Sequence, residues 1–452
     1  MEEIKPQNNN TRKFIEELLD RGDKIYLKTA LMDLHPADIA EVLTRMDEEK
    51  RDAIFGLLST ERAAEVLVEL DTSIRRNLLE KLNENRIVEI IETMDSDDAT
   101  DIIGELDEEL AQRILDAMPW KEFREVKTLL KHGEETAGGI MALEIVAVDQ
   151  DQTAEQALDV LRRKATEVED VYNIYVVDKK GVFKGLVTLK DLVLSNPKSK
   201  LSEIMDKEAI FVHPEMDRED VANLFHKYDL VAAPVVDEEG KLIGRITVDD
   251  VMDVVEEEAS EDMSLMAGIT DEKISERSVF KLSSVRLPWL LVAFAGEMVS
   301  ATVLHYFKAS LNQIVASAFF IPLIMAMGGN TGIQSATVVI RGLATGDIKL
   351  RDTWQRLIRE MSVAFLNGFV ISMLLLGVAF FWLHDPKFGL IAGVAMIAVL
   401  FNAAFMGTII PFLLKRIGID PAIATGPFIT TSNDVLGLVV YFGTITLSLQ
   451  WL

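Results

Sequence analysis

A single aspartate lies in the last apolar stretch of the 452-residue chain, within the sequence TTSNDVLGLVVYF at 430–442. This residue, Asp434, follows four hydroxyl and amide side chains. An unpaired charge inside a membrane costs several kcal/mol, and an intramembrane carboxylate is therefore interpreted first as part of an ion pathway. Apart from Arg341, the last residue of the second expected span, no Lys or Arg lies within the expected spans. The predicted counter-charge of Asp434 is consequently a passing cation.

A second polar segment interrupts an earlier apolar stretch, at MGGNTGIQSAT (327–337). Its paired glycines predict a loosened helix and a close backbone approach. Its amides and hydroxyls match the polar run beside Asp434, and both segments are expected to line one pore. The alternative is that these groups only hydrogen-bond between helices. The predicted pore and selectivity residues are Asp434, Asn330, Gly328, Gly329, Thr431 and Asn433.

Glu297 is the other carboxylate within an expected span. Its only polar neighbours in the sequence are Ser300 and Thr302. This isolation favours a role in helix packing, and a proton-carrying role beside Asp434 is the alternative.

The absence of cysteine and the scattered positions of the six histidines argue against a zinc or copper site. A hard cation with oxygen ligands fits better. Mg2+ releases its water reluctantly, so that carboxylates and polar groups would hold it through its hydration shell.

Five apolar stretches are long enough to span a membrane. They are expected at about 287–307, 313–341, 361–383, 388–414 and 422–450. Lys and Arg concentrate before the first stretch and after the second and fourth, which predicts a cytosolic N-terminus and an external C-terminus. An odd number of spans suits a homodimer with its pore between the subunits.

The first 286 residues are strongly acidic, whereas the rest of the chain holds nine Lys/Arg and seven Asp/Glu. An acidic surface repels nucleic acid and attracts cations. The N-terminus MEEIKPQNNNTRKF lacks the apolar core of a signal peptide, which predicts that this half stays in the cytosol. Phosphate-binding glycine loops, nucleophile elbows and histidine–metal motifs are absent from the sequence, so an enzyme is not expected.

A twelve-residue repeat runs from about 30 to 120. Apolar residues recur at offsets of one, three and four, which describes one face of a helix. Each apolar group is followed by a good N-cap residue. The sequence therefore predicts an acidic, all-α solenoid at 1–130. The expected N-caps are Asp47, Ser59, Asp71, Asn83, Asp95 and Asp107.

Residues 138–256 contain a tandem repeat offset by 59 residues. VYNIYVVDKKGVFKGLVTLKDL (171–192) matches LVAAPVVDEEGKLIGRITVDDV (230–251), and each copy predicts two strands and a helix. The pattern resembles the CBS domain, an α/β module that pairs in tandem. That resemblance implies that Thr188 with Asp191, and Thr247 with Asp250, could hold the ribose of an adenine nucleotide such as ATP. The alternative is that each pair caps its helix, and no aromatic residue stands at 173 or 230 to flank an adenine.

The segment VDDVMDVVEEEASEDM (248–263) is dense in carboxylates. Such density is repulsive unless cations neutralise it. It is interpreted either as a solvated helix end or as a patch that responds to Mg2+ or Ca2+.

The whole chain resembles the MgtE family of magnesium channels, most specifically in GGNTGIQSAT, IRGLATGDI and NDVLGL. The resemblance implies a homodimer in the cell membrane, with five spans at 287–452 and a connecting helix at 257–286. It further implies that Asp434 is the selectivity carboxylate and that cytosolic Mg2+ closes the channel by binding the acidic domains. The metal ligands that it implies are Asp434, Glu61, Asp97, Asp98, Asp229, Asp250, Glu258, Glu261, Asp262 and Asp420.

Two other functions remain open at this stage. One is a carrier that couples a divalent cation to protons or sodium. The other is a nucleotide sensor whose membrane half serves only as an anchor.

Overall fold

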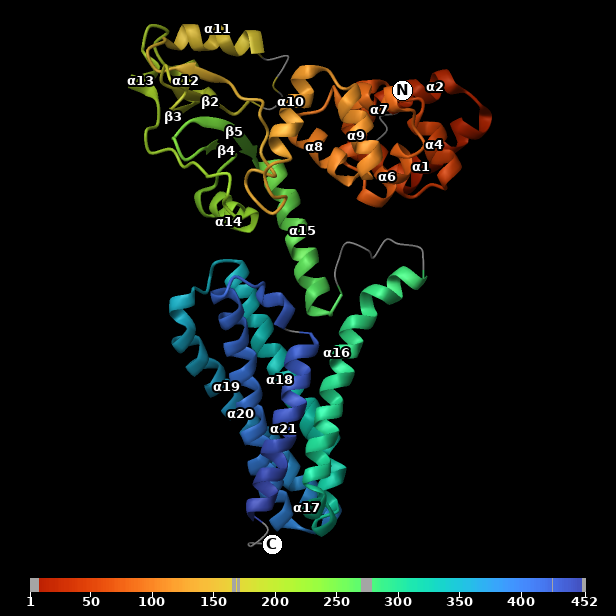
Figure 1. Cartoon of the computed structure of the whole chain (residues 1–452), viewed down its shortest axis with the longest axis vertical. Coiled ribbons are helices and arrows are strands. Elements are labelled where there is room, and N and C mark those ends of the chain that lie inside the picture. The colour runs from red at the N-terminus through yellow and green to blue at the C-terminus, as the bar shows by residue number, and fades with distance from the viewer. Residues whose placement is uncertain (1–7, 165–167, 169–170, 270–278, 425, 449–452) are drawn as a thin grey trace. The chain divides into compact units, whose positions relative to one another are not determined.

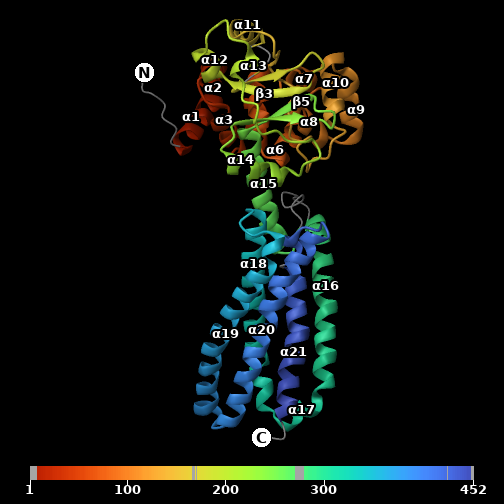
Figure 2. The same cartoon turned by 90° about the vertical axis from the view of Figure 1, so that its left-hand side faces the viewer.

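A computed structural model describes residues 8–164, 168, 171–269, 279–424 and 426–448. The chain divides into two compact units, Met1–Val254 and Val255–Leu452 (Figures 1 and 2). The first combines short helices with two small sheets, and the second contains five long apolar helices. The predicted fold class is confirmed: a helical N-terminal domain, a tandem α/β pair and five candidate membrane spans.

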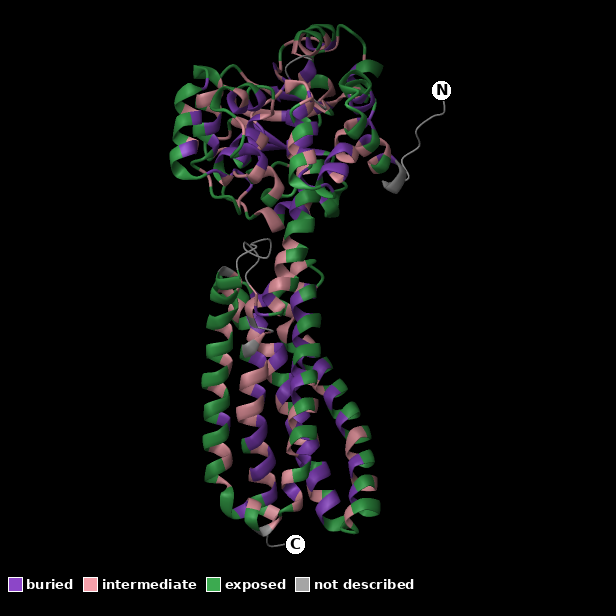
Figure 3. Ribbon diagram, turned by 90° about the vertical axis from the view of Figure 1, so that its right-hand side faces the viewer, coloured by how far each residue is buried: buried purple, intermediate pink, exposed green. Residues whose placement is uncertain are grey.

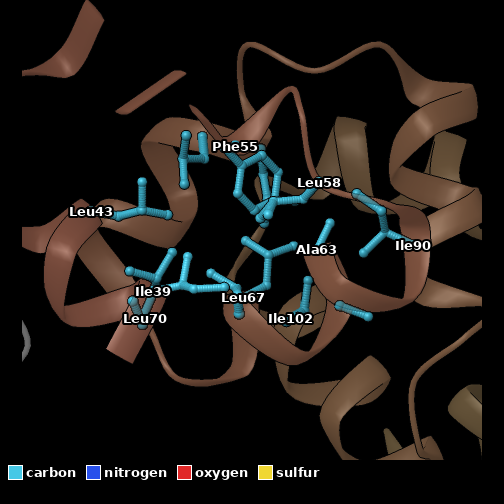
Figure 4. Packing of buried hydrophobic residues seen from close by; sticks show 14 of the residues in the cluster. Ile39, Leu43, Phe55, Leu58, Ala63, Leu67, Leu70, Ile90 and Ile102 are labelled. Atoms are coloured by element: carbon cyan, nitrogen blue, oxygen red, sulfur yellow. The ribbon is translucent and has the colours of Figure 1, made fainter. Parts of the chain in front are cut away.

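Among the described residues, ten helices form the N-terminal domain, and from α3 onward each begins twelve residues after the start of the one before. Their apolar faces share one continuous core, part of which Figure 4 shows around Leu43, Phe55 and Leu67. The helices are α1 (Asn8–Arg21), α2 (Lys24–Met32), α3 (Pro36–Thr44), α4 (Glu48–Phe55), α5 (Thr60–Val68), α6 (Thr72–Leu79), α7 (Glu84–Ile91), α8 (Ser96–Glu105), α9 (Glu108–Ala117) and α10 (Trp120–Leu129).

From α4 to α9 the helices alternate between two kinds of N-terminus, and this alternation doubles the repeat to 24 residues. Ser59, Asn83 and Asp107 accept hydrogen bonds from backbone N–H groups three residues ahead. The caps that alternate with them, Asp47, Asp71 and Asp95, make no such side-chain bond. Packing follows the same period, because α3 contacts α5, α5 contacts α7 and α7 contacts α9.

The tandem pair forms two sheets with matching irregularities. Strands β2 and β3 are antiparallel, as are β4 and β5, and both pairs shift register at equivalent valines, Val176/Val177 and Val235/Val236. The turns carry Gly181 and Gly240, each at φ +80°, where a side chain would be strained. The elements are β1 (Ala147–Asp149), α11 (Ala154–Lys164), β2 (Asn173–Val177), β3 (Phe183–Thr188), α12 (Leu189–Leu194), α13 (Leu201–Ile204), α14 (Arg218–Tyr228), β4 (Ala232–Val236) and β5 (Leu242–Thr247).

Helix α15 (Val248–Met266) begins at the second Thr-x-x-Asp motif and ends in the second unit. The segment 257–286 is thus not one separate helix. Its first part is the end of α15, its last part begins α16, and residues 270–278 lie outside the described residues.

In the described part of the membrane half, five helices are long and apolar enough to cross a bilayer. Buried residues line the faces that these helices turn toward one another, as Figure 3 shows. The helices of this half are α16 (Val279–Tyr306), α17 (Lys308–Gln313), α18 (Ala316–Ala344), α19 (Thr353–Val378), α20 (Pro386–Arg416) and α21 (Pro427–Ser448), with short turns at Leu350–Asp352, Ala379–Leu383 and Pro421–Ala424.

Three sequence-based expectations for this half are wrong. The paired glycines do not interrupt α18, which is one continuous helix. The stretch GPFITTSND (426–434) predicts a Gly-Pro kink inside the last span and a position near mid-span for Asp434, but Pro427 begins α21 and Asp434 is its eighth residue. The helical segment of the third span extends back to Leu350, so that Arg356 and Glu360 belong to it, together with Arg351, Asp352 and Arg359. Arg356 and Glu360 form an ion pair within this segment.

Candidate ion pathway and cation sites

Helices α16 and α21 approach closely at a glycine. A Cβ atom added to Gly296 would overlap the Cγ2 atom of Thr431, so that only glycine allows this approach. The next residue along α16, Glu297, thereby comes within hydrogen-bonding reach of the Asp434 carboxyl group. The two carboxylates lie on separate spans, as the sequence predicted, and the structure places them next to each other.

Helices α18, α20 and α21 meet at a second glycine contact. A Cβ atom on Gly332 would overlap the amide of Asn433, and one on Gly407 would overlap the carbonyl oxygen of Gly332. Asn433 is only 3% exposed, and neither its Oδ1 nor its Nδ2 atom has a hydrogen-bond partner among the described residues. The polar residue beside Asp434 is therefore held against the backbone of α18.

The remaining predicted pore residues divide between two faces of α18. Gly328 and Gly329 are buried, and Gly328 faces Val399 of α20. Asn330 is exposed, as are Gln334 and Thr337 at helical spacing along the same helix. α18 thus presents a row of amide and hydroxyl groups on a surface of the protomer where lipid would leave them without partners.

A buried ion pair braces the opposite side of α18. Ser335 Oγ donates a 2.9 Å hydrogen bond to Glu360 Oε2, and Arg356 Nη2 lies 2.7 Å from Glu360 Oε1. Ser335 is 4% and Glu360 9% exposed. Arg356 is one of the Lys and Arg residues that follow the second expected span, and its pairing with Glu360 was not predicted, although the four-residue spacing of Arg and Glu was a visible signal.

In the first unit, helix α8 and the second Thr-x-x-Asp motif bring together Asp97, Asp98 and Asp250. Burial, followed by the nearby charge of Asp250, raises the pKa of Asp97 well above its ordinary value. The same two causes raise the pKa of Asp98 to about 7, and burial raises that of Asp250 to about 6. Three carboxyl groups that disfavour ionisation together form a surface that a divalent cation would stabilise.

Two acidic residues that the sequence analysis did not single out lie at the edge of this cluster. Carboxylate oxygens of Asp95, Asp97 and Glu144 come within 4.8 Å of one another. Glu144 Oε2 also accepts a 2.8 Å hydrogen bond from Ser96 Oγ, and Asp95 lies 3.7 Å from Arg245. Asp95 was predicted only as a helix cap and makes no side-chain cap bond, and no pattern around Glu144 indicated a site.

In the second unit, Asp262 at the end of α15 faces Asp420 in the loop after α20. Burial, followed by the charges of Asp420 and Glu258, raises the pKa of Asp262 to about 6. Next to this pair, Leu265 packs with Ala336, Ile340 and residues at the start of α21. The end of α15 therefore lies against the helices that carry the intramembrane polar groups.

The remaining predicted ligands are Glu61, Asp229, Glu258 and Glu261, of which Glu258 lies near Asp262 and contributes its charge there. Glu61 is exposed in the first turn of α5, where backbone and Ser59 hydrogen bonds lower its pKa. Asp229 ends α14 in a left-handed conformation at φ 51°. Glu258 and Glu261 lie on α15.

Each predicted nucleotide-binding pair is bonded internally. Thr188 Oγ1 donates a 2.7 Å hydrogen bond to Asp191, and the Thr247 hydroxyl donates to Asp250. Asp191 is exposed, whereas Asp250 belongs to the cluster with Asp97 and Asp98. Both Thr–Asp pairs are therefore arranged as helix caps. Only the first pair leaves its aspartate, Asp191, exposed to solvent.

Comparisons with known proteins match nearly every part of the chain. Residues 321–444 match the MgtE family, described as a divalent cation transporter, and 34–135 match the MgtE intracellular N domain. Residues 137–195 and 201–257 match the CBS domain. All three agree with the resemblances found in the sequence.

Individual relatives match this chain over most of their own length. The chain is 41% identical to the magnesium transporter MgtE of Thermus thermophilus and 34% identical to that of Bacillus subtilis. These matches cover 72% of this chain and 73% of the first relative, and 74% of this chain and of the second. The crystal structure of the cytosolic domain of the Mg2+ channel MgtE in complex with ATP is also similar, with 38% identity and a TM-score of 0.52 over 53% of this chain and 98% of that one.

Proposed function

The chain belongs to the MgtE family of divalent cation transporters, and on this premise we propose that it conducts Mg2+ through the membrane along a path that passes Asp434. The observation that carries this proposal is the half-buried Asp434 carboxylate inside α21, paired with Glu297 rather than with a basic side chain. Two neighbouring carboxylates on two adjacent apolar spans require a cation or a proton between them. Membership of this family also agrees with the expectation that the chain is not an enzyme.

The path is proposed to run between two copies of the chain. Glu297 on α16 and the row Asn330, Gln334 and Thr337 on α18 are exposed on a single protomer. Exposed carboxylate and amide groups in a span are unfavourable against lipid but suit a water-filled, protein-lined path. A two-fold homodimer would enclose such a path. The positive-inside pattern then puts the N-terminal unit in the cytosol and the C-terminus outside.

Mg2+ is proposed to close this path from the cytosolic side through two carboxylate clusters. One joins α8 of the helical domain to Asp250 of the tandem pair, and the other joins Asp262 to Asp420. Helix α15 carries a ligand of each, because Asp250 is its third residue and Asp262 its fifteenth. Bound Mg2+ would hold the end of α15 against α18 and α21. For closure, Mg2+ must bind the closed state more tightly than the open one.

Adenine nucleotide binding is proposed for the first Thr-x-x-Asp motif. Asp191 is exposed there, whereas Asp250 belongs to the buried cluster with Asp97 and Asp98. A titration of the full-length protein with ATP should therefore lose its heat signal in Asp191→Ala. A signal that Asp191→Ala leaves intact would contradict this assignment.

The transport proposal is tested by Mg2+ flux into liposomes that contain the purified full-length protein. Asp434→Asn keeps the size and polarity of the side chain and removes its charge. We expect flux to fall to the level of empty liposomes, whereas Asp347→Asn, in the loop after α18, should leave it unchanged. Undiminished flux in a folded Asp434→Asn protein would contradict the proposal.

The close pair of Glu297 and Asp434 also fits a carrier that exchanges Mg2+ for protons. The two mechanisms differ in their driving force. A channel conducts along the Mg2+ gradient when the pH and sodium concentration are equal on both sides. Flux that requires a pH gradient would favour the carrier.

A further inference from the structure

We propose that Glu297 is a second carboxylate of the ion site at Asp434, so that each protomer presents two acidic side chains, one from α16 and one from α21, to a hydrated divalent cation. This inference rests on the proposed Mg2+ conduction and assigns a role to the first membrane helix.

The geometry that carries the inference is the close contact of α16 with α21. α16 packs mainly against α21, and the two helices lie side by side in Figures 1 and 2. Gly296 allows their backbones to approach, because any Cβ atom there would overlap Thr431. Glu297 follows directly and reaches the Asp434 carboxyl group three residues beyond Thr431. A larger residue at 296 would separate the two carboxylates.

The same part of α16 carries a buried hydroxyl group, that of Ser300, for which the described residues provide no hydrogen-bond partner. Ser300 is 4% exposed, and among the residues of α16 whose burial is described it alone is buried. It lies nearly one turn after Glu297, and because α16 packs mainly against α21, its burial places it at that contact.

The Ser300 hydroxyl differs from other hydroxyls in the spans. Thr302, Thr408 and Thr444 each donate to the carbonyl oxygen four residues earlier, the usual arrangement in an apolar helix. Ser300 Oγ is buried without any hydrogen-bond partner among the described residues. An unpartnered buried hydroxyl between the helices that carry Glu297 and Asp434 is suited to a water molecule of a hydrated cation.

Electrostatics favours a divalent ion at this position. Two carboxylates within hydrogen-bonding reach repel each other when both are ionised, and one divalent cation neutralises both. Glu297 is exposed on the protomer and Asp434 is half-buried, so the pair lies at the rim of the helix contact rather than inside it. A cation that keeps most of its water, as Mg2+ does, fits such an open rim better than a closed cage.

The test compares Glu297→Gln with wild type and Asp434→Asn in full-length protein reconstituted into liposomes. Mg2+ flux is measured over a range of Mg2+ concentrations, and Na+ leak is measured in parallel. We expect Glu297→Gln to raise the Mg2+ concentration for half-maximal flux roughly tenfold, because ligand charge sets cation affinity. It should also increase Na+ leak relative to Mg2+ flux. Met298→Gln is the matched control, since Met298 is exposed on the adjacent position of α16.

The outcomes separate this inference from the proposed function. If wild type conducts Mg2+ and Asp434→Asn does not, but Glu297→Gln keeps the wild-type half-saturation and Na+ leak, Glu297 is not a ligand and the inference is overturned. If wild type carries no Mg2+, the proposed function itself fails. Glu297→Ala serves where Glu297→Gln does not fold. It also removes the charge, and an unchanged half-saturation in this variant would equally overturn the inference.

Discussion

The Oγ atom of Ser335 on α18 donates a 2.9 Å hydrogen bond to the Oε2 atom of Glu360 on α19. The other oxygen of that carboxylate receives Arg356, one turn earlier on the same helix. One turn from Ser335, Gly332 packs against the amide of Asn433, the neighbour of Asp434. The ion pair on α19 therefore fixes the face of α18 that supports the proposed ion site.

Removing Glu360 should destabilise the membrane half. Glu360→Ala leaves Arg356 as an uncompensated, mostly buried charge, which typically lowers the free energy of unfolding by about 3–5 kcal/mol. Ser335→Ala removes one hydrogen bond and should have a smaller effect, on the order of 1 kcal/mol. Thermal unfolding of the full-length protein in detergent measures both. Arg359→Ala is the control, because Arg359 is exposed on the same helix. Equal losses in Arg359→Ala and Glu360→Ala would show that the buried pair has no special role.

Two glycines three residues apart on α18 should respond in opposite directions to alanine. A Cβ atom at Gly332 would overlap Asn433, and relieving that overlap in a packed core typically costs about 1–3 kcal/mol. A Cβ atom at Gly329 meets nothing within 4 Å, and alanine favours a helix by roughly 1 kcal/mol over glycine. Gly332→Ala should therefore lower the unfolding temperature, while Gly329→Ala should keep or raise it. A destabilised Gly329→Ala variant would contradict the open space beside Gly329.

Local sequence patterns predicted the elements well because their signals lie within a few residues. The twelve-residue period placed the caps, and Glu48, Thr60 and Thr72 each begin a helix directly after one. The shared 59-residue offset predicted two similar strand pairs, and their register shifts confirm it. Hydropathy predicted the number of spans, which depends on length and composition alone.

The relationships that define the sites were not predictable in this way. Asp98 and Asp250 are 152 positions apart, and only the packing of the helical domain on the tandem pair makes them neighbours. The Thr-x-x-Asp motif therefore suggested that Asp250 binds a ribose, whereas in the structure Asp250 lies next to Asp97 and Asp98. The approach of Glu297 to Asp434 likewise depends on Gly296, whose role becomes visible only when Thr431 lies opposite. Arg356 and Glu360 were assigned outside the third span because an ion pair cannot be recognised from hydropathy.

The alternating caps of the helical domain predict alternating sensitivity to alanine. Asn83 Oδ1 accepts a 2.8 Å hydrogen bond from the N–H group of Arg86, and losing such a cap typically costs about 1 kcal/mol. Asp71 occupies the equivalent position one helix earlier and makes no side-chain cap bond. Asn83→Ala should therefore speed hydrogen exchange in α7 of the full-length protein more than Asp71→Ala speeds it in α6. Equal effects would mean that helix dipoles, rather than these hydrogen bonds, determine the stability of the helix starts.

The cluster of Asp97, Asp98 and Asp250 predicts a dependence of stability on pH that Mg2+ reverses. Folding raises the pKa of Asp98 to about 7 and that of Asp250 to about 6, above the ordinary value of 3.8. The folded state therefore holds protons that the unfolded chain has released. Without Mg2+, the stability of this contact should be greatest near pH 4 and should fall as the pH rises toward 7. Mg2+ replaces the protons, so its stabilising effect should be larger at pH 8 than at pH 5.5.

Hydrogen exchange in α8 of the full-length protein, with EDTA or with Mg2+ at pH 5.5 and pH 8, measures this dependence. The exchange rates must first be corrected for their intrinsic change with pH. Asp98→Asn should protect α8 at pH 8 in EDTA and weaken the response to Mg2+, because it removes one repelling charge and one ligand. Asp116→Asn is the control, since Asp116 is exposed on α9 outside the cluster and bonds Gln112. Protection that increases with pH in EDTA, or an equal response to Mg2+ in both variants, would show that these carboxylates do not bind the ion. The proposed closure would then have to depend on Asp262 and Asp420 alone.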